Sequence, residues 1–201
     1  LETGDAQFCD RVNRGPGTGT LWIGQDNVLS VDDNLGFFAT KGFDYTIDYT
    51  LGVGDMGSVN ITTIGTYLDT WDQQEFVGED IEDCVGIWSA SCGAPTFEWQ
   101  NNLRVSWMTP WALTLSAQWR YMSEIDDADD NWDLPSQDYL DLSGIWDITD
   151  MITLRAGIQN VTDEDPPFTD AGPSIFGNGN TFAGVYDALG RYYFIGGTFQ
   201  F

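Results

Sequence analysis

The sequence predicts an all-β protein built from antiparallel strands, and three patterns support this prediction. Segments of about ten residues alternate between apolar and polar side chains, which is the period of a strand with two different faces. Short turns and long acidic loops follow one another along the chain. Aromatic residues make up 14% of the chain, which contains 9 tryptophans. Together these patterns are typical of an antiparallel transmembrane β-barrel.

The alternation indicates seven strands and the turns between them. Residues 37–53 alternate strictly, and Gly54 to Gly57 then provide the residue types of a tight turn. Residues 58–71 return from that turn. The remaining predicted strands are residues 97–108, 112–123, 139–147, 152–161 and 191–201. A possible short strand, or the upper part of one, lies at residues 28–35.

The same alternation assigns side chains to the two faces of the sheet. We expect the outward, lipid-facing side chains to include Leu113, Leu115, Leu140, Leu142, Leu154 and Ile158. The inward face is expected to include Thr114, Gln118, Arg155 and Gln159. On the last strand, the membrane-facing residues are predicted to be Tyr193, Ile195, Phe199 and Phe201. A register shift of one residue would exchange the two sets.

The charge of the chain narrows the classes of function. The 201 residues include 32 acidic and 7 basic side chains, for a net charge of −25. Binding nucleic acid requires Lys and Arg to neutralise phosphates, so a nucleic-acid partner is excluded. The chain contains 0 histidines, which removes His-based triads, HExxH sites and most zinc sites. We therefore expect neither an enzyme nor a bound cofactor or metal.

Three long loops are predicted at residues 73–96, 124–137 and 162–188. The first contains Cys84 and Cys92, which bracket the stretch CVGIWSASC. A disulfide between them suits an oxidising compartment, although the sequence also allows three unrelated buried thiols. The second loop carries a group of acidic residues, Asp126, Asp127, Asp129, Asp130 and Asp133. Such a group offers oxygen ligands for Ca²⁺, but it lacks the EF-hand glycine and closing glutamate, so a solvated loop is favoured.

Other candidate sites have simpler interpretations. The pair Asp44 and Asp48 is compatible with acid–base chemistry, yet a polar inner wall is favoured. The run from Gly15 to Gly19 lacks the lysine and helix of a phosphate-binding loop, which favours a surface loop. Basic side chains are predicted on the inner faces of the later strands at Arg104, Arg120 and Arg155. The hairpin across residues 109–111 predicts that Arg120 lies near Glu98, in an ordinary ion pair.

The end of the chain resembles a known family. The segment YDALGRYYFIGGTFQF resembles the end of a TonB-dependent receptor, in which an amphipathic strand finishes on phenylalanine, here Phe201. The segment NVTDEDPPF, from Asn160 to Phe168, resembles the family's N-(L/V)-T-D-x-x-P-P segment. The stretch KGFDYTIDY is similar to a strand of the same family.

This resemblance implies that residues 1–201 are the C-terminal part of a receptor barrel, without its plug domain. Such barrels have about 22 strands, of which this chain supplies about seven or eight. The implied function is energy-coupled import of an iron chelate, vitamin or carbohydrate across the outer membrane of a Gram-negative cell. The implied partners are the lipid bilayer, a ligand at the external loops, and the barrel-assembly machinery at the C-terminal strand. A TonB complex would act through an upstream region, which would also hold the partner of Cys9.

Two other hypotheses remain open at this point. A small complete barrel of about eight strands would act as a passive pore or structural protein. A soluble lectin-like module is disfavoured because nearly every strand carries outward Leu, Ile or Trp residues. The larger-barrel hypothesis predicts an open sheet in which residues 191–201 lack a partner strand on one side. Backbone pairing between that strand and the first strand would favour the small complete barrel.

Overall fold

The computed structural model describes residues 9–21, 27–30, 36–89, 91–128, 133–169 and 180–201, and the statements below concern these residues. The chain divides into two compact units. The first comprises residues 1–38 and 73–82, and the second comprises residues 39–72 and 83–201. Within the described part of the chain, no helix has the length and apolar character needed to cross a membrane.

The first unit contains a small antiparallel ribbon of β1 (Val12–Asn13) and β2 (Asn27–Val28). The side chain of Asn13 donates a hydrogen bond to Asn27 Oδ1 across the ribbon, at 2.8 Å. The glycine run forms a turn, because the Gly15 N–H donates to the Thr20 carbonyl and the Gly19 N–H donates to the Gly15 carbonyl. The expected strand at residues 28–35 is a strand only at Val28, and residues 31–35 lie outside the described residues.

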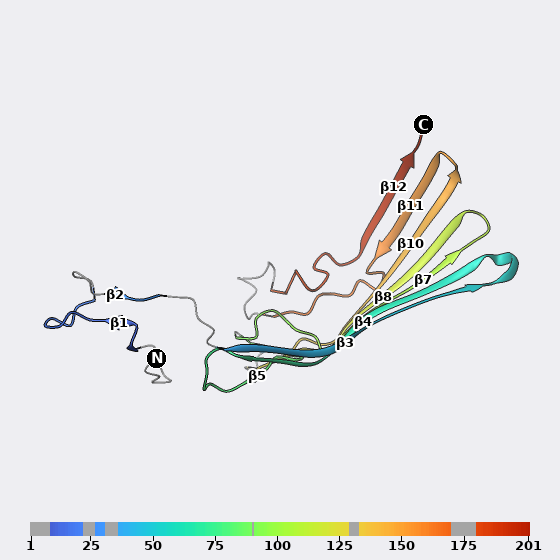
Figure 1. The fold of residues 1–201 in the computed structure, drawn as a ribbon. Helices are drawn as coiled ribbons and strands as arrows, with labels where there is room; N and C mark the ends of the chain where they lie inside the picture. The colour runs from blue at the N-terminus through green and yellow to red at the C-terminus, as the bar shows by residue number, and fades with distance from the viewer. Residues whose placement is uncertain (1–8, 22–26, 31–35, 90, 129–132, 170–179) are drawn as a thin grey trace. The chain divides into compact units, whose positions relative to one another are not determined.

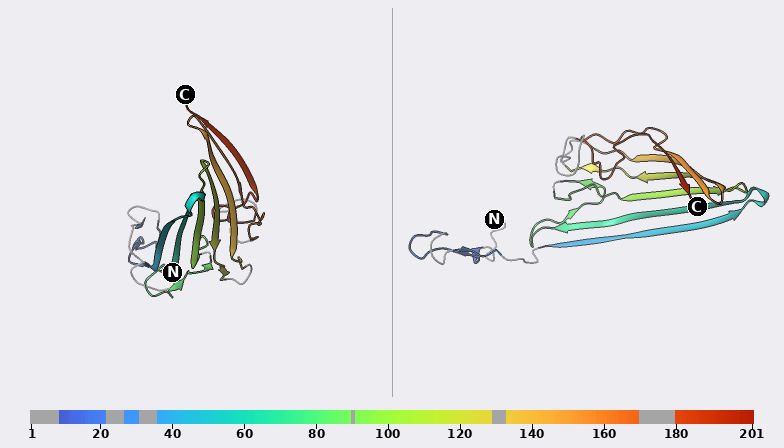
Figure 2. Two further views of the ribbon diagram at one scale, coloured as in Figure 1. Left: turned by 90° about the vertical axis from the view of Figure 1, so that its right-hand side faces the viewer. Right: turned by 90° about the horizontal axis from the view of Figure 1, so that it is seen from above.

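The second unit is dominated by one large sheet with the strand order β12-β11-β10-β8-β7-β4-β3 (Figure 1). Neighbouring strands from β4 to β12 run antiparallel, which confirms the predicted all-β antiparallel class. The strands are β3 (Phe37–Gly52), β4 (Ser58–Gln74), β7 (Trp99–Met108), β8 (Leu113–Met122), β10 (Gln137–Thr149), β11 (Ile152–Gln159) and β12 (Tyr192–Phe199). Figure 2 shows that these strands form a curved sheet.

The tight turn between β3 and β4 has glycine at a position where other residues would be strained. A single 3₁₀ turn, η1 (Gly54–Met56), is followed by Gly57, whose φ of 94° favours glycine. The Val53 N–H donates to the Gly57 carbonyl at 2.9 Å. A Cβ atom added at Gly57 would lie 2.1 Å from the Met108 carbonyl oxygen, so the neighbouring strand leaves no room for one.

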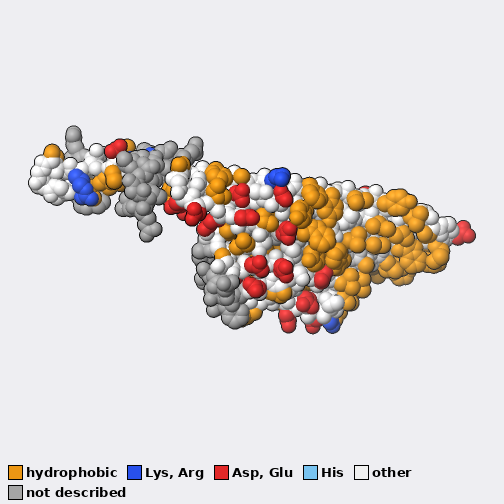
Figure 3. Space-filling view, turned by 90° about the horizontal axis from the view of Figure 1, so that it is seen from below, with side chains coloured by type: hydrophobic (Ala, Val, Ile, Leu, Met, Phe, Trp, Pro, Cys, Tyr) orange, Lys and Arg blue, Asp and Glu red, His pale blue; other side chains and the backbone are white. Residues whose placement is uncertain are grey.

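The strand register gives the sheet one apolar and one polar face. Trp107 lies opposite Leu115, Ala117 opposite Leu142, and Ile158 opposite Tyr193, so apolar residues adjoin one another from strand to strand. The apolar face carries the predicted set Leu113, Leu115, Leu140, Leu142, Leu154 and Ile158. The polar face carries Thr114, Gln118, Arg155 and Gln159. Figure 3 shows a broad band of hydrophobic side chains with acidic side chains beside it.

The long loops contain short strands that were not predicted. Residues 73–96 include β5 (Glu82–Asp83), which pairs with β4, and β6 (Ile87–Trp88). Residues 124–137 include β9 (Asp126–Asp127), which pairs with β6 in parallel. Two-residue strands show no alternation that a sequence pattern could reveal, because a period of two needs several repeats to be recognised.

The largest cluster of buried apolar residues among those described lies in the loops. Phe97, Ile125, Leu134, Phe182 and Tyr186 are buried together, with Trp88, Met122 and Val185 packed against them. The Trp88 and Phe182 rings lie 5.9 Å apart, and the Phe97 and Tyr186 rings meet edge to face. Residues from three long loops thus form a core beside the end of the sheet, whereas many sheet side chains are exposed.

Candidate functional site

A charged cluster on the polar face joins the sheet to the third long loop. Arg120 of β8 contacts Asp141 of the neighbouring β10, with Nε 2.9 Å from Oδ2. Its Nη1 also donates to Asp187 Oδ1 of the loop, at 3.2 Å. The Arg120 guanidinium lies 4.8 Å from the centre of the Tyr139 ring, and the Tyr139 hydroxyl accepts a hydrogen bond from the Asp187 N–H. One arginine therefore holds two carboxylates and an aromatic ring at this end of the sheet.

The expected pairing of Arg120 with Glu98 was wrong. The β7–β8 register places Arg120 opposite Asn102, four positions along the strand from Glu98. Glu98 instead accepts a hydrogen bond from the Tyr67 hydroxyl at 2.9 Å. The hairpin closes through the Thr109 N–H and the Leu113 carbonyl, and this closure fixes the register. The expected ion pair on the inner face exists, but its acids are Asp141 and Asp187.

Asn160 fixes the segment that follows β11. Its side chain is fully buried, and its φ of 50° is in the left-handed region that asparagine tolerates. Its side-chain nitrogen donates to the Glu164 carbonyl and its side-chain oxygen accepts from the Glu164 N–H, both at 2.8 Å. The Asn160 N–H donates to Asp141 Oδ1, which also contacts Arg120. The start of the NVTDEDPPF segment is thus bound to the charged cluster.

A polar cavity of about 350 Å³ lies beside this cluster on the same face. Arg104 Nε donates to Gln118 Oε1 across β7 and β8 at 3.0 Å. Both signs of charge are present, because the lining also contains Arg120, Asp141 and Asp187. The lining residues are Arg104, Gln118, Arg120, Asp141, Leu142, Ser143, Gln159, Asp187 and Phe194.

Three other charged residues of the polar face make contacts outside the Arg120 cluster, namely Asp44, Asp48 and Arg155. Asp48 accepts a hydrogen bond from the Thr62 hydroxyl and Asp44 accepts one from the Thr66 hydroxyl, both at 2.6 Å. Each carboxylate is therefore bound to a neighbouring strand, as expected of a polar wall. Arg155 lies opposite Gly196, where an added Cβ would be 2.8 Å from Arg155 Nε. The glycine gives the arginine side chain room to lie over β12.

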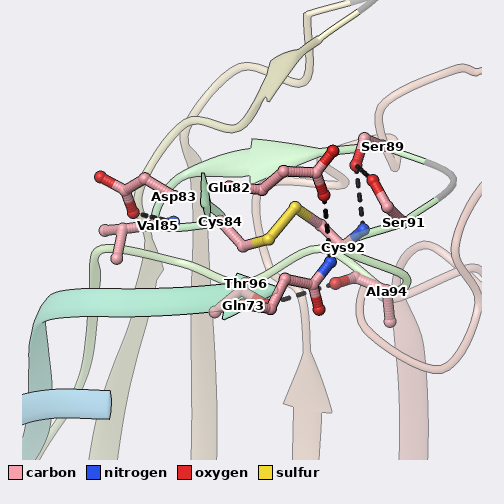
Figure 4. Close-up of a disulfide and its surroundings, with 10 residues drawn as sticks. All are labelled: Gln73, Glu82, Asp83, Cys84, Val85, Ser89, Ser91, Cys92, Ala94 and Thr96. Carbon is pink, nitrogen blue, oxygen red and sulfur yellow. Dashed lines mark hydrogen bonds between the residues drawn. A yellow bond between two sulfur atoms is a disulfide. The ribbon is translucent and has the colours of Figure 1, made fainter. Parts of the chain in front are cut away.

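A disulfide joins Cys84 and Cys92, whose Cα atoms are 5.6 Å apart (Figure 4). Cys84 is buried, and its N–H donates to the Trp71 carbonyl at the end of β4. The Cys92 N–H donates to Ser89 Oγ at 2.9 Å. The bridge therefore closes a short loop and holds it against the sheet. Cys9 has an exposed thiol that is not bridged within the described residues.

The last strand forms an edge of the sheet. Tyr193, Ile195 and Phe199 lie opposite Ile158, Ala156 and Ile152 on the apolar face, and all three are exposed. Phe201 follows the strand and is also exposed. Among the described residues, β12 pairs with β11 alone, and β3 forms the other edge of the sheet. The predicted open sheet is therefore present.

The acidic loop does not bring its described carboxylates to one side. Asp126 and Asp127 form β9, in which successive side chains point in opposite directions. Asp126 is exposed whereas Asp127 is buried. Asp133 is exposed, and Asp129 and Asp130 lie outside the described residues.

One cluster on the apolar face was not singled out from the sequence. Its members are Phe43 and Tyr45 of β3, Tyr67 of β4, Trp99 of β7 and Tyr121 of β8. Together with Glu98, Ser123, Glu124 and Ser136, they line a pocket of about 380 Å³. The sequence signal was present, because each aromatic belongs to the outward set near the loop end of its strand.

Comparison with solved structures reveals a likeness in fold. No model of a protein family matches the chain, and no curated protein matches it either. Among solved structures, the chain is similar to a point mutant of the ferric enterobactin receptor from Pseudomonas aeruginosa, with a TM-score of 0.53. The sequences are 16% identical, and the match covers 82% of this chain and 22% of the receptor. The likeness shows that the antiparallel sheet is similar in fold to part of that receptor.

Proposed function

We propose that the chain forms part of the barrel wall and external loops of a TonB-dependent outer-membrane receptor. The observation that carries this proposal is the register of the main sheet, which joins the apolar residues of successive strands into one exposed face. The likeness to part of the ferric enterobactin receptor supports the same architecture. Under this proposal, the apolar face contacts lipid and the polar face lines the interior.

The dimensions and side chains of the sheet suit a membrane. β7 and β8 contain 10 residues each, and a tilted strand needs about 9–11 residues to cross a bilayer. Aromatic residues lie toward both ends of the apolar face, with Trp99 and Tyr121 at the loop end and Trp107, Trp146 and Phe199 at the turn end. Barrels carry such aromatic girdles where the membrane meets water. Val105 and Leu142 lie between them and remain exposed.

The same proposal assigns roles to the loops and to the partners. The loop core and the Cys84–Cys92 disulfide stiffen the external surface, where a scarce small ligand would first bind. Iron chelates, vitamins and carbohydrates are the candidate ligands. β12 would be the strand that the barrel-assembly machinery recognises. Energy coupling would come from an inner-membrane TonB complex.

A small complete barrel acting as a passive pore is the second candidate. It requires β3 and β12 to pair and close the cylinder. Within the described residues, β3 and β12 are instead the two edges of the sheet. The open sheet therefore supports the larger-barrel proposal.

Uptake measurements in cells distinguish the two functions. We expect the full-length protein to fractionate with the outer membrane and to support uptake of its ligand. Uptake should stop when the inner-membrane proton gradient is dissipated, because transport against a gradient needs that energy. The ligand screen should compare ferric chelates, vitamin B12 and oligosaccharides in cells with and without the protein. Uptake that persists without the proton gradient would identify a passive pore and contradict the receptor proposal.

A further inference from the structure

We propose that the aromatic pocket on the apolar face binds an organic cation, namely a primary or methylated ammonium group. This aromatic pocket is the one of about 380 Å³ defined above by Phe43, Tyr45, Tyr67, Trp99 and Tyr121. It lies on the opposite face from the charged cluster of Arg120, so it is separate from the polar cavity. Three observations support the proposal: the placement of the rings, the internal hydrogen bonds of their polar atoms, and the charge of the lining.

The five aromatic side chains come from four adjacent strands and contact one another. Phe43 and Tyr67 are stacked with ring centres 5.4 Å apart, and Trp99 and Tyr121 lie 4.8 Å apart. Tyr45 lies across Gly65, where an added Cβ would be 2.3 Å from the tyrosine ring. The glycine therefore makes the space that Tyr45 occupies. Phe43 and Trp99 remain exposed, so a ligand can reach these two rings.

The polar atoms of the rings are bound within the protein. The Tyr45 hydroxyl donates to Asn101 Oδ1 at 2.8 Å and accepts a hydrogen bond from Trp99 Nε1 at 3.1 Å. The Tyr67 hydroxyl donates to Glu98 Oε1 at 2.9 Å. Since these hydrogen-bond donors are occupied, the rings and carboxylates supply ring faces and acceptor oxygens to a ligand. An ammonium group uses both, because it is attracted to aromatic faces and donates to carboxylates.

The charge of the lining selects a cation. Glu98 and Glu124 are both acidic, and the lining residues that the structure describes include neither lysine nor arginine. Lys41 lies near the same end of β3, but Asp69 holds its ammonium at 2.8 Å. The two carboxylates would repel an anion, whereas an ammonium group can donate hydrogen bonds to them. Aromatic cages recognise quaternary ammonium groups by the same combination.

An ammonium ligand has two possible sources. It is either a free amine in solution or the ammonium headgroup of a membrane lipid. The apolar face and the neighbouring girdle residues make the second source accessible if this face contacts lipid. The chemistry that the pocket recognises is the same in both cases, and the proposal does not depend on the receptor function.

Choline and its neutral analogue provide a direct test with the unmodified full-length protein. The protein is held in a polyoxyethylene detergent, which has neither an ammonium nor a sugar headgroup. Isothermal titration then compares choline with 3,3-dimethyl-1-butanol, which has the same shape without the charge, and with glucose. We expect choline to bind about 10-fold more tightly than the neutral analogue. Equal binding of the two compounds, or binding of glucose alone, would overturn the proposal.

Matched variants locate the binding. Trp99→Leu and Glu124→Gln should each weaken choline binding by about 5- to 30-fold, through the loss of a ring face or a charge. Trp111→Leu and Asp150→Asn likewise remove a tryptophan ring and a carboxylate charge, in turns at the other end of the sheet, and they should leave binding unchanged. Circular dichroism verifies that each variant is folded. Choline binding that survives in both pocket variants would place the cation elsewhere and refute the assignment.

Nanodiscs identify the source of the ligand. One preparation contains phosphatidylethanolamine, which carries an ammonium headgroup, and the other contains phosphatidylglycerol, which does not. The titrations are made at about 1 M salt, which screens the negative surface charge of phosphatidylglycerol. Weaker apparent choline affinity in phosphatidylethanolamine then indicates that the lipid competes for the pocket and is the ligand. Equal affinity in the two preparations indicates a free amine, and either result supports a cation site.

Discussion

Asp163 Oδ1 accepts a hydrogen bond from the backbone N–H of Arg191 at 2.8 Å, although the two residues are 28 positions apart. This contact links the segment after β11 to the start of β12, across the third long loop. The two side chains also form an ion pair at 3.9 Å, but both are substantially exposed. Exposed ion pairs contribute little, so the backbone hydrogen bond is the stabilising part of the contact.

Asp163→Ala should therefore destabilise the last hairpin. The loss of a charge-assisted hydrogen bond predicts a cost of about 1–2 kcal/mol in the free energy of unfolding. Arg191→Ala keeps the backbone N–H and removes only the ion pair, so it should cost less than about 0.5 kcal/mol. Urea titration in detergent measures both. A larger effect for Arg191→Ala would show that the side-chain ion pair carries the contact.

Gly57→Ala should destabilise the β3–β4 turn. Alanine is strained at a φ of 94°, and its Cβ would meet the Met108 carbonyl oxygen. We expect a loss of about 2–3 kcal/mol. Gly52→Ala is the matched control, because an added Cβ there meets nothing within 4 Å. Thermal unfolding followed by circular dichroism compares the two, and equal midpoints would argue against a strained turn.

Arg120→Ala should be more damaging than Arg104→Ala. Removing Arg120 leaves the part-buried carboxylates of Asp141 and Asp187 without their cation, at a cost of about 2–3 kcal/mol. Arg104 is exposed and donates to the neutral Gln118, so its loss should cost about 0.5 kcal/mol. Limited proteolysis of the third long loop provides a second readout. Equal protease sensitivity of the two variants would contradict the role of Arg120 in holding that loop.

The sequence predicted the sheet better than the loops, for a physical reason. A strand repeats every two residues, so the faces of Leu142 and Gln118 follow from local alternation. Asp187 reaches Arg120 from 67 positions away, and no local period reports such a contact. The parallel pairing of Ile87 with Asp126 likewise depends on how two loops fold together. The aromatic pocket was missed because it needs the register of four strands.

The hydroxyl of Tyr186 tests the energetic cost of burying a polar group that makes no hydrogen bond. Its hydroxyl is buried and has no partner among the described residues, and burial raises the pKa of this hydroxyl. Tyr186→Phe should therefore leave stability unchanged or raise it by about 1 kcal/mol. Tyr139→Phe should instead lower stability by about 1 kcal/mol, because the Asp187 N–H loses its acceptor. Urea titration at neutral pH compares the two variants, and a clear loss of stability in Tyr186→Phe would contradict this account.

The raised pKa also predicts how Tyr186 affects stability at alkaline pH. The unfolded chain ionises this tyrosine at a pH of about 10, whereas the folded chain keeps it neutral to a higher pH. The contribution of Tyr186 to the free energy of unfolding is therefore fully present below pH 10, and it is lost as the pH rises toward the pKa of the folded state. Tyr186→Phe should remove the part of the stability loss at alkaline pH that comes from this tyrosine. An unchanged dependence of stability on pH would contradict this prediction.

The most direct test of the membrane assignment compares adjacent residues of β10. Leu142→Cys and Ser143→Cys place a thiol on the apolar and polar faces, in a Cys9→Ser background that leaves the disulfide intact. Each thiol receives a nitroxide spin label, and the full-length protein is placed in lipid vesicles. The account predicts that the label at 142 is relaxed mainly by oxygen, which concentrates in lipid, and the label at 143 mainly by a water-soluble nickel chelate. Equal access of the nickel chelate to both labels would contradict it.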